Sequence, residues 1–278
     1  MKHIVVISAG FNTEERECAE QLSSRMPDYK FLFFSPENFK GPFRRFRFNR
    51  ATRKAVSNSC LALVSPAAAA EHAQALPVRP LPCGVDFEAF NSSAERNLPF
   101  PDDLFNIKNP IIGHFGCLDG NANLQIIKKA AEAHPEWSFV FVGSVLTELS
   151  SLHSPSLNGI PGNVHVLGEK PRHHLPAYIS RFDVCVNIAN SSLASAENLY
   201  QYLASGKPVV SLPHPAQALD YADAIYLAGT PEEFISLCKK ALGERDAWKV
   251  RRRVEYGRAA SWDARAAELE RTIKELSV

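Results

Sequence analysis

The sequence predicts an α/β protein with two domains, each built on a parallel β-sheet covered by helices. Short runs of β-branched and apolar residues alternate with amphipathic stretches of helical period in both halves of the chain. The connections between them are short, which favours parallel strands joined by helices. Residues 91–109 are rich in Asn, Ser, Pro and acidic residues, as expected for a linker between the two halves.

The overall composition is that of an ordinary globular protein. The 278 residues carry a net charge of +1, with 45% hydrophobic and 22% charged residues, so no overall field points to nucleic acid. The six cysteines are scattered without a Cys-x-x-Cys pair, which argues against a metal site or a disulfide framework and favours a cytoplasmic setting. No apolar run approaches the ~20 residues of a membrane span. Peripheral attachment to the inner face of a membrane stays open.

The first 95 residues are expected to form an α/β domain that opens with a β-α-β unit. Gly10 follows the first strand, at the edge where open α/β sheets bind ligands, so Gly10, Phe11 and Asn12 are candidate acceptor-side residues. The expected elements are strands at 3–8, 29–34, 60–64 and 78–81 and helices at 14–26 and 66–76.

A basic stretch, residues 40–54, holds seven basic residues, three phenylalanines and no acid. It is either a solvated loop that leads into a helix, or a patch for anionic lipid head groups, an acidic acceptor or nucleic acid. The interleaved phenylalanines favour a membrane interface or a stacking surface over a simple charged face. Arg44, Arg45 and Arg47 are therefore candidate acceptor-side or membrane-side residues, and nucleic acid is the least supported partner.

The second half, residues 96–260, shows the strand–helix alternation more clearly. The expected strands are 111–115, 137–142, 164–168, 184–188, 208–212 and 224–227, and the expected helices are 123–133, 174–180 and 231–242. A further amphipathic stretch at 246–276 is interrupted at Ser261-Trp262. This pattern predicts a parallel sheet covered on both faces.

Residues 191–211 predict a helix that feeds a buried strand. Ser195 is the expected N-cap, and Glu197 lies in the first turn, where the helix dipole favours negative charge. Gly206 is expected to end the helix, because glycine is favoured just past a helix C-terminus. The free N–H groups at the N-terminus of such a helix suit a phosphate.

Residues 199–210, Leu-Tyr-Gln-Tyr-Leu-Ala-Ser-Gly-Lys-Pro-Val-Val, resemble the donor-binding helix of GT-B nucleotide-sugar glycosyltransferases of the family 1/4 type. Further segments match that family in order: residues 82–86, 112–116, 134–137, 163–168, 175–178 and 182–184. The resemblance implies two Rossmann-like domains, a reduced acceptor-side domain at 1–95 and a donor-binding domain at 96–260. A C-terminal helix at 261–278 would cross back to the first domain.

The resemblance also implies a metal-independent transfer of a sugar from a nucleotide diphosphate donor, with no cofactor. Backbone N–H groups, helix dipoles and basic side chains would stabilise the charge on the leaving diphosphate. Neither a general base nor any other catalytic residue, nor the oligomeric state, can be assigned from the sequence. The donor-binding residues that the resemblance implies are Gly116, Cys117, Gly143, Lys170, Arg172, Glu197, Asn198, Leu199 and Gln201.

Two positions depart from the family pattern. Asn198 stands where the family usually has lysine, and Gln201 stands where it usually has glutamate. Because charged hydrogen bonds contribute ~1.5–3 kcal/mol against ~1 for neutral ones, the two changes predict donor binding weakened by roughly 10- to 1,000-fold. Glu197, one turn earlier, either replaces the missing ribose acceptor or only complements the helix dipole. The alternative function is a weakened scaffold that binds a nucleotide, a membrane or a partner subunit.

Overall fold

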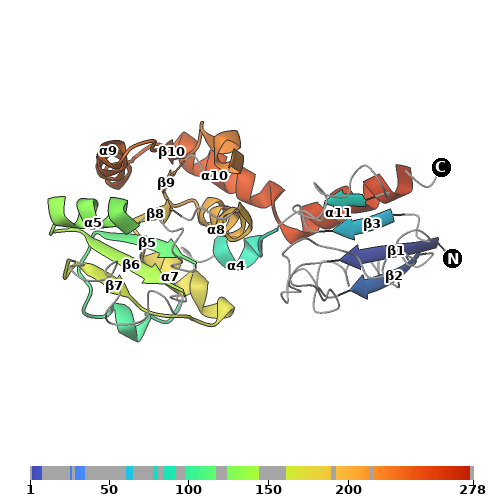
Figure 1. Ribbon diagram of the computed structural model, residues 1–278, viewed down its shortest axis with the longest axis horizontal. Coiled ribbons are helices and arrows are strands. Elements are labelled where there is room, and N and C mark those ends of the chain that lie inside the picture. The colour runs from blue at the N-terminus through green and yellow to red at the C-terminus, as the bar shows by residue number, and fades with distance from the viewer. Residues whose placement is uncertain are drawn as a thin grey trace, which may run out of the picture. The chain divides into compact units, whose positions relative to one another are not determined.

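The chain divides into two compact units in a computed structural model (Figure 1), Met1–Gly84 with Ala260–Val278, and Val85–Ala259. The sequence places these limits at residues 95 and 260. The structure describes residues 2–7, 26, 29–34, 61–64, 78–80, 84–91, 98–116, 124–143, 161–188, 192–212 and 216–275.

The first unit holds a four-stranded parallel sheet in the order β2-β1-β3-β4. Its strands are β1 (Lys2–Ile7), β2 (Tyr29–Phe34), β3 (Leu61–Val64) and β4 (Val78–Pro80). Each lies within two residues of its expected position, which confirms the four strands. The expected helices at 14–26 and 66–76 fall almost wholly outside the described residues. So do Gly10, Phe11, Asn12, Arg44, Arg45, Arg47 and the rest of the basic stretch.

Helix α11 (Trp262–Glu275) belongs to this first unit although it closes the chain. The predicted break at Ser261-Trp262 is confirmed, because α10 (Ala247–Ala259) ends just before it. The Ser261 hydroxyl accepts a hydrogen bond from the Ala264 N–H at 3.1 Å and so caps the new helix. The Trp262 ring packs so closely on Gly84 that a Cβ there would lie 2.6 Å from it.

The second unit is built on a six-stranded parallel sheet in the order β10-β9-β8-β5-β6-β7. Its strands are β5 (Ile111–Phe115), β6 (Ser138–Val142), β7 (Val164–Val166), β8 (Val184–Asn187), β9 (Val209–Ser211) and β10 (Tyr226–Leu227). Numbered in chain order, the strands have the doubly wound arrangement 3-2-1-4-5-6. The chain adds strands outward from β5 in one direction and then, from β8, in the other, so the strand order reverses between β5 and β8. The predicted α/β class with a parallel sheet is therefore confirmed.

Helices cover both faces of this sheet (Figure 1), which explains why every residue of β5 and β6 is buried. On one face α5 (Leu124–Ala133) and α9 (Pro231–Leu242) pack on a core that contains Ile112 and Val186. On the other face lie α7 (Leu175–Arg181) and α8 (Ser192–Ser205), where the Phe115 ring meets the Tyr202 ring at 5.8 Å. The helix α4 (Phe87–Asn91) and the short 3-10 helices η3 (Asp102–Leu104), η4 (Arg172–His174) and η5 (Ala216–Tyr221) complete the unit.

Helix α8 begins one turn earlier than the sequence predicts. It starts at Ser192, so the prediction of Ser195 as N-cap is wrong. Several serines precede the apolar face and each has the same capping chemistry, so residue type alone does not fix the first turn. The predicted end is confirmed: Gly206 has a φ of +71°, and its N–H donates to the Leu203 carbonyl oxygen at 3.0 Å.

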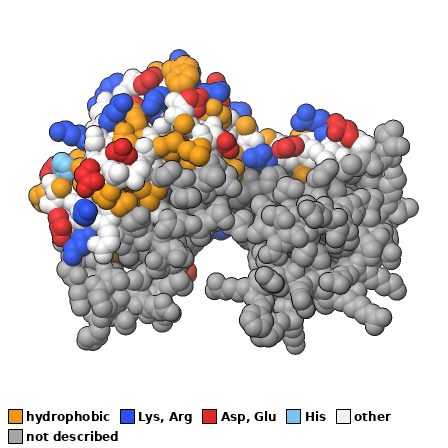
Figure 2. All heavy atoms as spheres, turned by 45° about the horizontal axis from the view of Figure 1, so that its top comes forward, with side chains coloured by type: hydrophobic (Ala, Val, Ile, Leu, Met, Phe, Trp, Pro, Cys, Tyr) orange, Lys and Arg blue, Asp and Glu red, His pale blue; other side chains and the backbone are white. Residues whose placement is uncertain are grey.

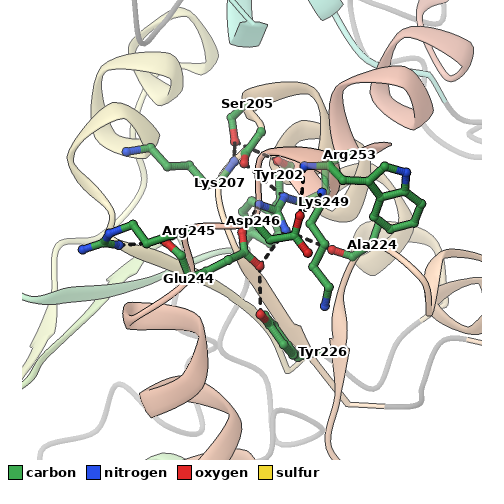
Figure 3. A network of polar contacts seen from close by, with 12 residues as sticks. Tyr202, Ser205, Lys207, Ala224, Tyr226, Glu244, Arg245, Asp246, Lys249 and Arg253 are labelled. Atoms are coloured by element: carbon green, nitrogen blue, oxygen red, sulfur yellow. Dashed lines mark hydrogen bonds and ion pairs between the residues drawn. The ribbon is translucent and has the colours of Figure 1, made fainter. Parts of the chain in front are cut away.

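A buried arginine holds the C-terminal end of α8 (Figure 3). Arg253 of α10 is fully buried; its Nε donates to the Gly206 carbonyl oxygen and its Nη1 to that of Ala224, both at 3.0 Å. Its charge is balanced by Glu244, which also accepts a hydrogen bond from the Tyr226 hydroxyl at 2.9 Å. One guanidinium thereby ties α8 to β10 and to the α9–α10 connection.

The surface of the described residues is mixed in charge. On the face drawn in Figure 2, Lys and Arg side chains are interspersed with Asp and Glu. This agrees with the net charge of +1 and gives no sign of a one-signed field on that face. Among the helices that the structure describes, none combines the length and apolar character that a membrane crossing requires.

Candidate functional site

A pocket opens at the carboxyl ends of β5 and β6, beside the point where the strand order reverses. Open α/β sheets bind ligands at this place because the loops on either side of the reversal diverge. The cavity has a volume of about 290 Å³. It is lined by Phe115, Gly116, Val142, Gly143, Glu169, Lys170, Arg172, Leu175, Glu197, Asn198 and Gln201.

Two glycines let the strand ends of the pocket approach each other. Gly116 has a φ of +124°, and a Cβ there would lie 2.8 Å from the Asn198 side-chain nitrogen. A Cβ on Gly143 would lie 1.9 Å from the Gly116 carbonyl oxygen, so only glycine fits. The Gly116 N–H donates to the Val142 carbonyl oxygen, and the Gly143 N–H to that of Gly168, each at 3.0 Å. Backbone can approach a ligand here, but these two amides already have acceptors.

Asn198 fastens α8 to the end of β5. Its Nδ2 donates to the Phe115 carbonyl oxygen at 2.7 Å, in a contact that is buried. The Phe115 N–H in turn donates to the Tyr202 hydroxyl of α8 at 2.7 Å. Asn198 is thereby part of the wall of the pocket.

His114 lies directly behind this wall in its neutral form. Its Nδ1 is 2.8 Å from the Val186 carbonyl oxygen, which can only accept, so Nδ1 carries the proton. Full burial lowers the pKa of His114 to about 4, although the Val186 bond opposes this shift. Its Nε2 is a buried acceptor without a hydrogen-bond donor among the described residues.

Gln201 presents an unmet acceptor at the pocket. The side chain is only 4% exposed, and its Oε1 has no hydrogen-bond partner in the described part of the chain. A buried polar atom without a partner is costly, roughly 1–3 kcal/mol, so this oxygen requires a hydrogen-bond donor. A hydroxyl or N–H group of a ligand would satisfy it.

The two cations of the pocket are both held by carboxylates. Lys170 Nζ lies 2.7 Å from Asp103 Oδ2, and Asp103 also accepts hydrogen bonds from the Tyr178 hydroxyl at 2.9 and 3.0 Å. Burial and the Asp103 bond raise the pKa of Tyr178 well above its usual range, so this hydroxyl stays a donor. Arg172 Nη1 lies 2.8 Å from Glu197 Oε1. Of the two cations, Arg172 is paired with a carboxylate that itself lines the pocket.

The structure brings together seven of the nine donor-site residues predicted from the sequence. Leu199 is fully buried and does not line the pocket. Cys117 lies outside the described residues. The seven that line the pocket are Gly116, Gly143, Lys170, Arg172, Glu197, Asn198 and Gln201.

The sequence did not point to several other groups of the site. Glu169 and Leu175 line the pocket. They lie within three residues of the predicted positions Lys170 and Arg172, so the sequence could have suggested them. Asp103 had no such signal, because it lies far from Lys170 along the chain and only the fold joins them. Within the described residues, no group of three or more His, Cys, Asp or Glu side chains is arranged to hold a metal ion.

Comparison with known proteins finds similarity to glycosyltransferases. Residues 109–244 match the family model of glycosyl transferases group 1, as the sequence resemblance predicted. A Bacillus subtilis (strain 168) protein named as a teichuronic acid biosynthesis glycosyltransferase, TuaH, is 28% identical over 189 residues. That alignment covers 65% of this chain and 46% of TuaH, so the chain spans about half of that relative.

Solved structures share the fold. The Anabaena protein HepE (Alr3699), crystallised in complex with UDP, has a TM-score of 0.66 at 14% identity, over 99% of this chain and 100% of that one. A glycosyltransferase from Rickettsia africae ESF-5 gives a TM-score of 0.63 at 9% identity, over 99% and 98% of the two chains. At these identities the similarity shows the fold alone.

Proposed function

We propose, on the premise that residues 109–244 match the glycosyl transferases group 1, that this chain transfers a sugar from a nucleotide diphosphate donor to an acceptor. The donor would bind in the pocket of the second unit. The reaction would need no metal ion, because side chains of the protein would stabilise the charge on the leaving diphosphate.

One observation carries this proposal. Seven residues chosen from the sequence for donor binding come from the ends of two strands, the segment after β7 and helix α8, and they line one pocket at the strand-order reversal. The pocket offers what a nucleotide sugar requires: a close-approach surface at Gly116, cations at Lys170 and Arg172, and an unmet acceptor at Gln201. In this assignment Gln201 accepts from a ribose hydroxyl, and Arg172 faces the diphosphate.

The acceptor is proposed from two weaker indications. TuaH is named for the biosynthesis of teichuronic acid, and the basic stretch at residues 40–54 would suit an anionic or lipid-linked acceptor. We therefore propose an anionic or lipid-linked acceptor.

A second candidate is a nucleotide-binding scaffold without transfer. It is favoured by the neutral residues Asn198 and Gln201 and by the pairing of both pocket cations with carboxylates. Each of these features lowers the positive charge available to a leaving diphosphate. Binding without turnover would distinguish this candidate from the enzyme.

The experiment is calorimetric titration of UDP, GDP, ADP and CDP in EDTA, followed by a screen for nucleotide released from the matching nucleotide sugars. We expect one nucleotide to bind without metal and the matching nucleotide sugar to be cleaved slowly by water. The variant Gln201→Leu should weaken that binding. Gln125→Leu, on the exposed side of α5, is the matched control and should leave it unchanged.

Three results are informative. Binding together with nucleotide release supports the transferase. Binding with no release under any condition supports the scaffold. Failure of all four nucleotides to bind would overturn both.

A further inference from the structure

The pocket has no surplus positive charge among its described lining residues. Its charged lining residues are two acids, Glu169 and Glu197, and two bases, Lys170 and Arg172. A nucleoside diphosphate therefore has to displace a carboxylate from one of these cations before it gains a full charge-assisted contact.

Lys170 is the less exchangeable of the two. Its partner Asp103 is held by the Tyr178 hydroxyl, whose proton lies between the two carboxylate oxygens, and Asp103 does not line the pocket. A ligand that drew Lys170 away would leave the Asp103 carboxylate behind with the tyrosine hydroxyl.

Arg172 differs in the position and exposure of its partner. The Arg172 side chain is 47% exposed and the Glu197 side chain 17%, so the pair sits at the edge of the pocket, within reach of solvent and ligand. Both residues line the cavity. A phosphate on Arg172 would lie beside the Glu197 carboxylate and repel it.

We propose that Glu197 is a specificity-determining residue that competes with ligand phosphates for Arg172. This inference rests on the proposed nucleotide binding in the same pocket. The Arg172–Glu197 pair then sets the affinity according to the phosphate charge of the ligand. The affinity for the nucleoside part does not depend on this pair, because Gln201 and not Glu197 accepts a hydrogen bond from the ribose. A ligand with more phosphate charge at Arg172 loses more to this competition.

The test is a double-mutant cycle with Glu197→Gln and Arg172→Gln, titrated with uridine, UMP, UDP and inorganic pyrophosphate. Glu197→Gln should raise the affinity for UDP by about three- to tenfold, raise that for UMP less and leave that for uridine unchanged. Arg172→Gln should weaken UDP. In the Arg172→Gln background, the gain from Glu197→Gln should vanish, because no arginine remains to be released.

Glu169→Gln is the matched control. Glu169 lines the same pocket, and no ion pair of it is found among the described residues. The substitution changes the charge of the pocket by the same amount as Glu197→Gln without releasing Arg172, so the gain for UDP should be smaller.

Four results would overturn the inference. These are an equal gain from Glu169→Gln, a gain that persists without Arg172, a change in uridine affinity on Glu197→Gln, and no binding of UDP or pyrophosphate by any variant. The pyrophosphate arm separates the two proposals. Coupling seen with pyrophosphate while no nucleotide binds would refute the proposed function and leave only the competition between Glu197 and a ligand phosphate for Arg172. Nucleotide binding without coupling would refute the inference alone.

Discussion

Gln201 is the pocket residue whose hydrogen bonding is least complete. It is nearly fully buried, yet its Oε1 has no partner among the described residues. Folding has removed this oxygen from bulk water, and a donor such as a ligand hydroxyl would restore the lost hydrogen bond. A neutral amide serves this purpose at a lower desolvation cost than a carboxylate would.

Gln201→Glu should tighten uridine binding by about tenfold at neutral pH, since a charged acceptor forms the stronger hydrogen bond. Calorimetry with uridine measures this directly. The gain should disappear as the pH falls and the new carboxyl becomes protonated. Gln125→Glu on the exposed face of α5 is the control for net charge. Unchanged or weaker binding by Gln201→Glu would mean that another group holds the ribose.

His114 gives a second prediction at this scale, on stability. Its pKa is lowered from 6.5 to about 4 in the folded protein, so below pH 6.5 the unfolded chain binds a proton that the folded protein does not. The free energy of unfolding should therefore fall by roughly 3 kcal/mol from this group between pH 7 and pH 4. His114→Gln should lose that part of the pH dependence in urea titrations. Parallel pH profiles of the two proteins would contradict the assignment.

Helix α8 is the element on which the site depends. It supplies Glu197, Asn198 and Gln201 to the pocket, and its C-terminal end is held by Arg253. The apolar face and the Gly206 stop were readable from the sequence because they follow from helical period and backbone conformation. The start was misread because consecutive serines carry the same capping signal. The Arg253 network was not readable, since it joins groups that are distant along the chain.

Arg253→Met should cost about 3–5 kcal/mol, because it leaves the buried Glu244 carboxylate without its cation. The free energy of unfolding from urea titration measures it. The adjacent Arg252 pairs with Asp223 at an exposed position, so Arg252→Met should cost much less. Similar losses for both variants would show that burial does not set the contribution of Arg253.

At the scale of the whole molecule, two parallel sheets follow from the order of strands and helices in the sequence. The strand ends at Gly116 and Gly143 were recognisable as a ligand edge because parallel sheets place all their carboxyl ends together. The pairings that neutralise Lys170 and Arg172 were not, because they depend on side-chain directions in three dimensions. The local sequence pattern thus predicted the location of the pocket. Its net charge depends on ion pairs between residues that are distant along the chain.

The position of UDP in a crystal structure of its complex with this protein, grown in EDTA, is the most direct test of these conclusions. We predict the ribose within hydrogen-bonding distance of Gln201 Oε1, and the diphosphate beside Gly116 with Arg172 turned away from Glu197. UDP found elsewhere on the protein, or in the pocket with its ribose far from Gln201, would contradict it.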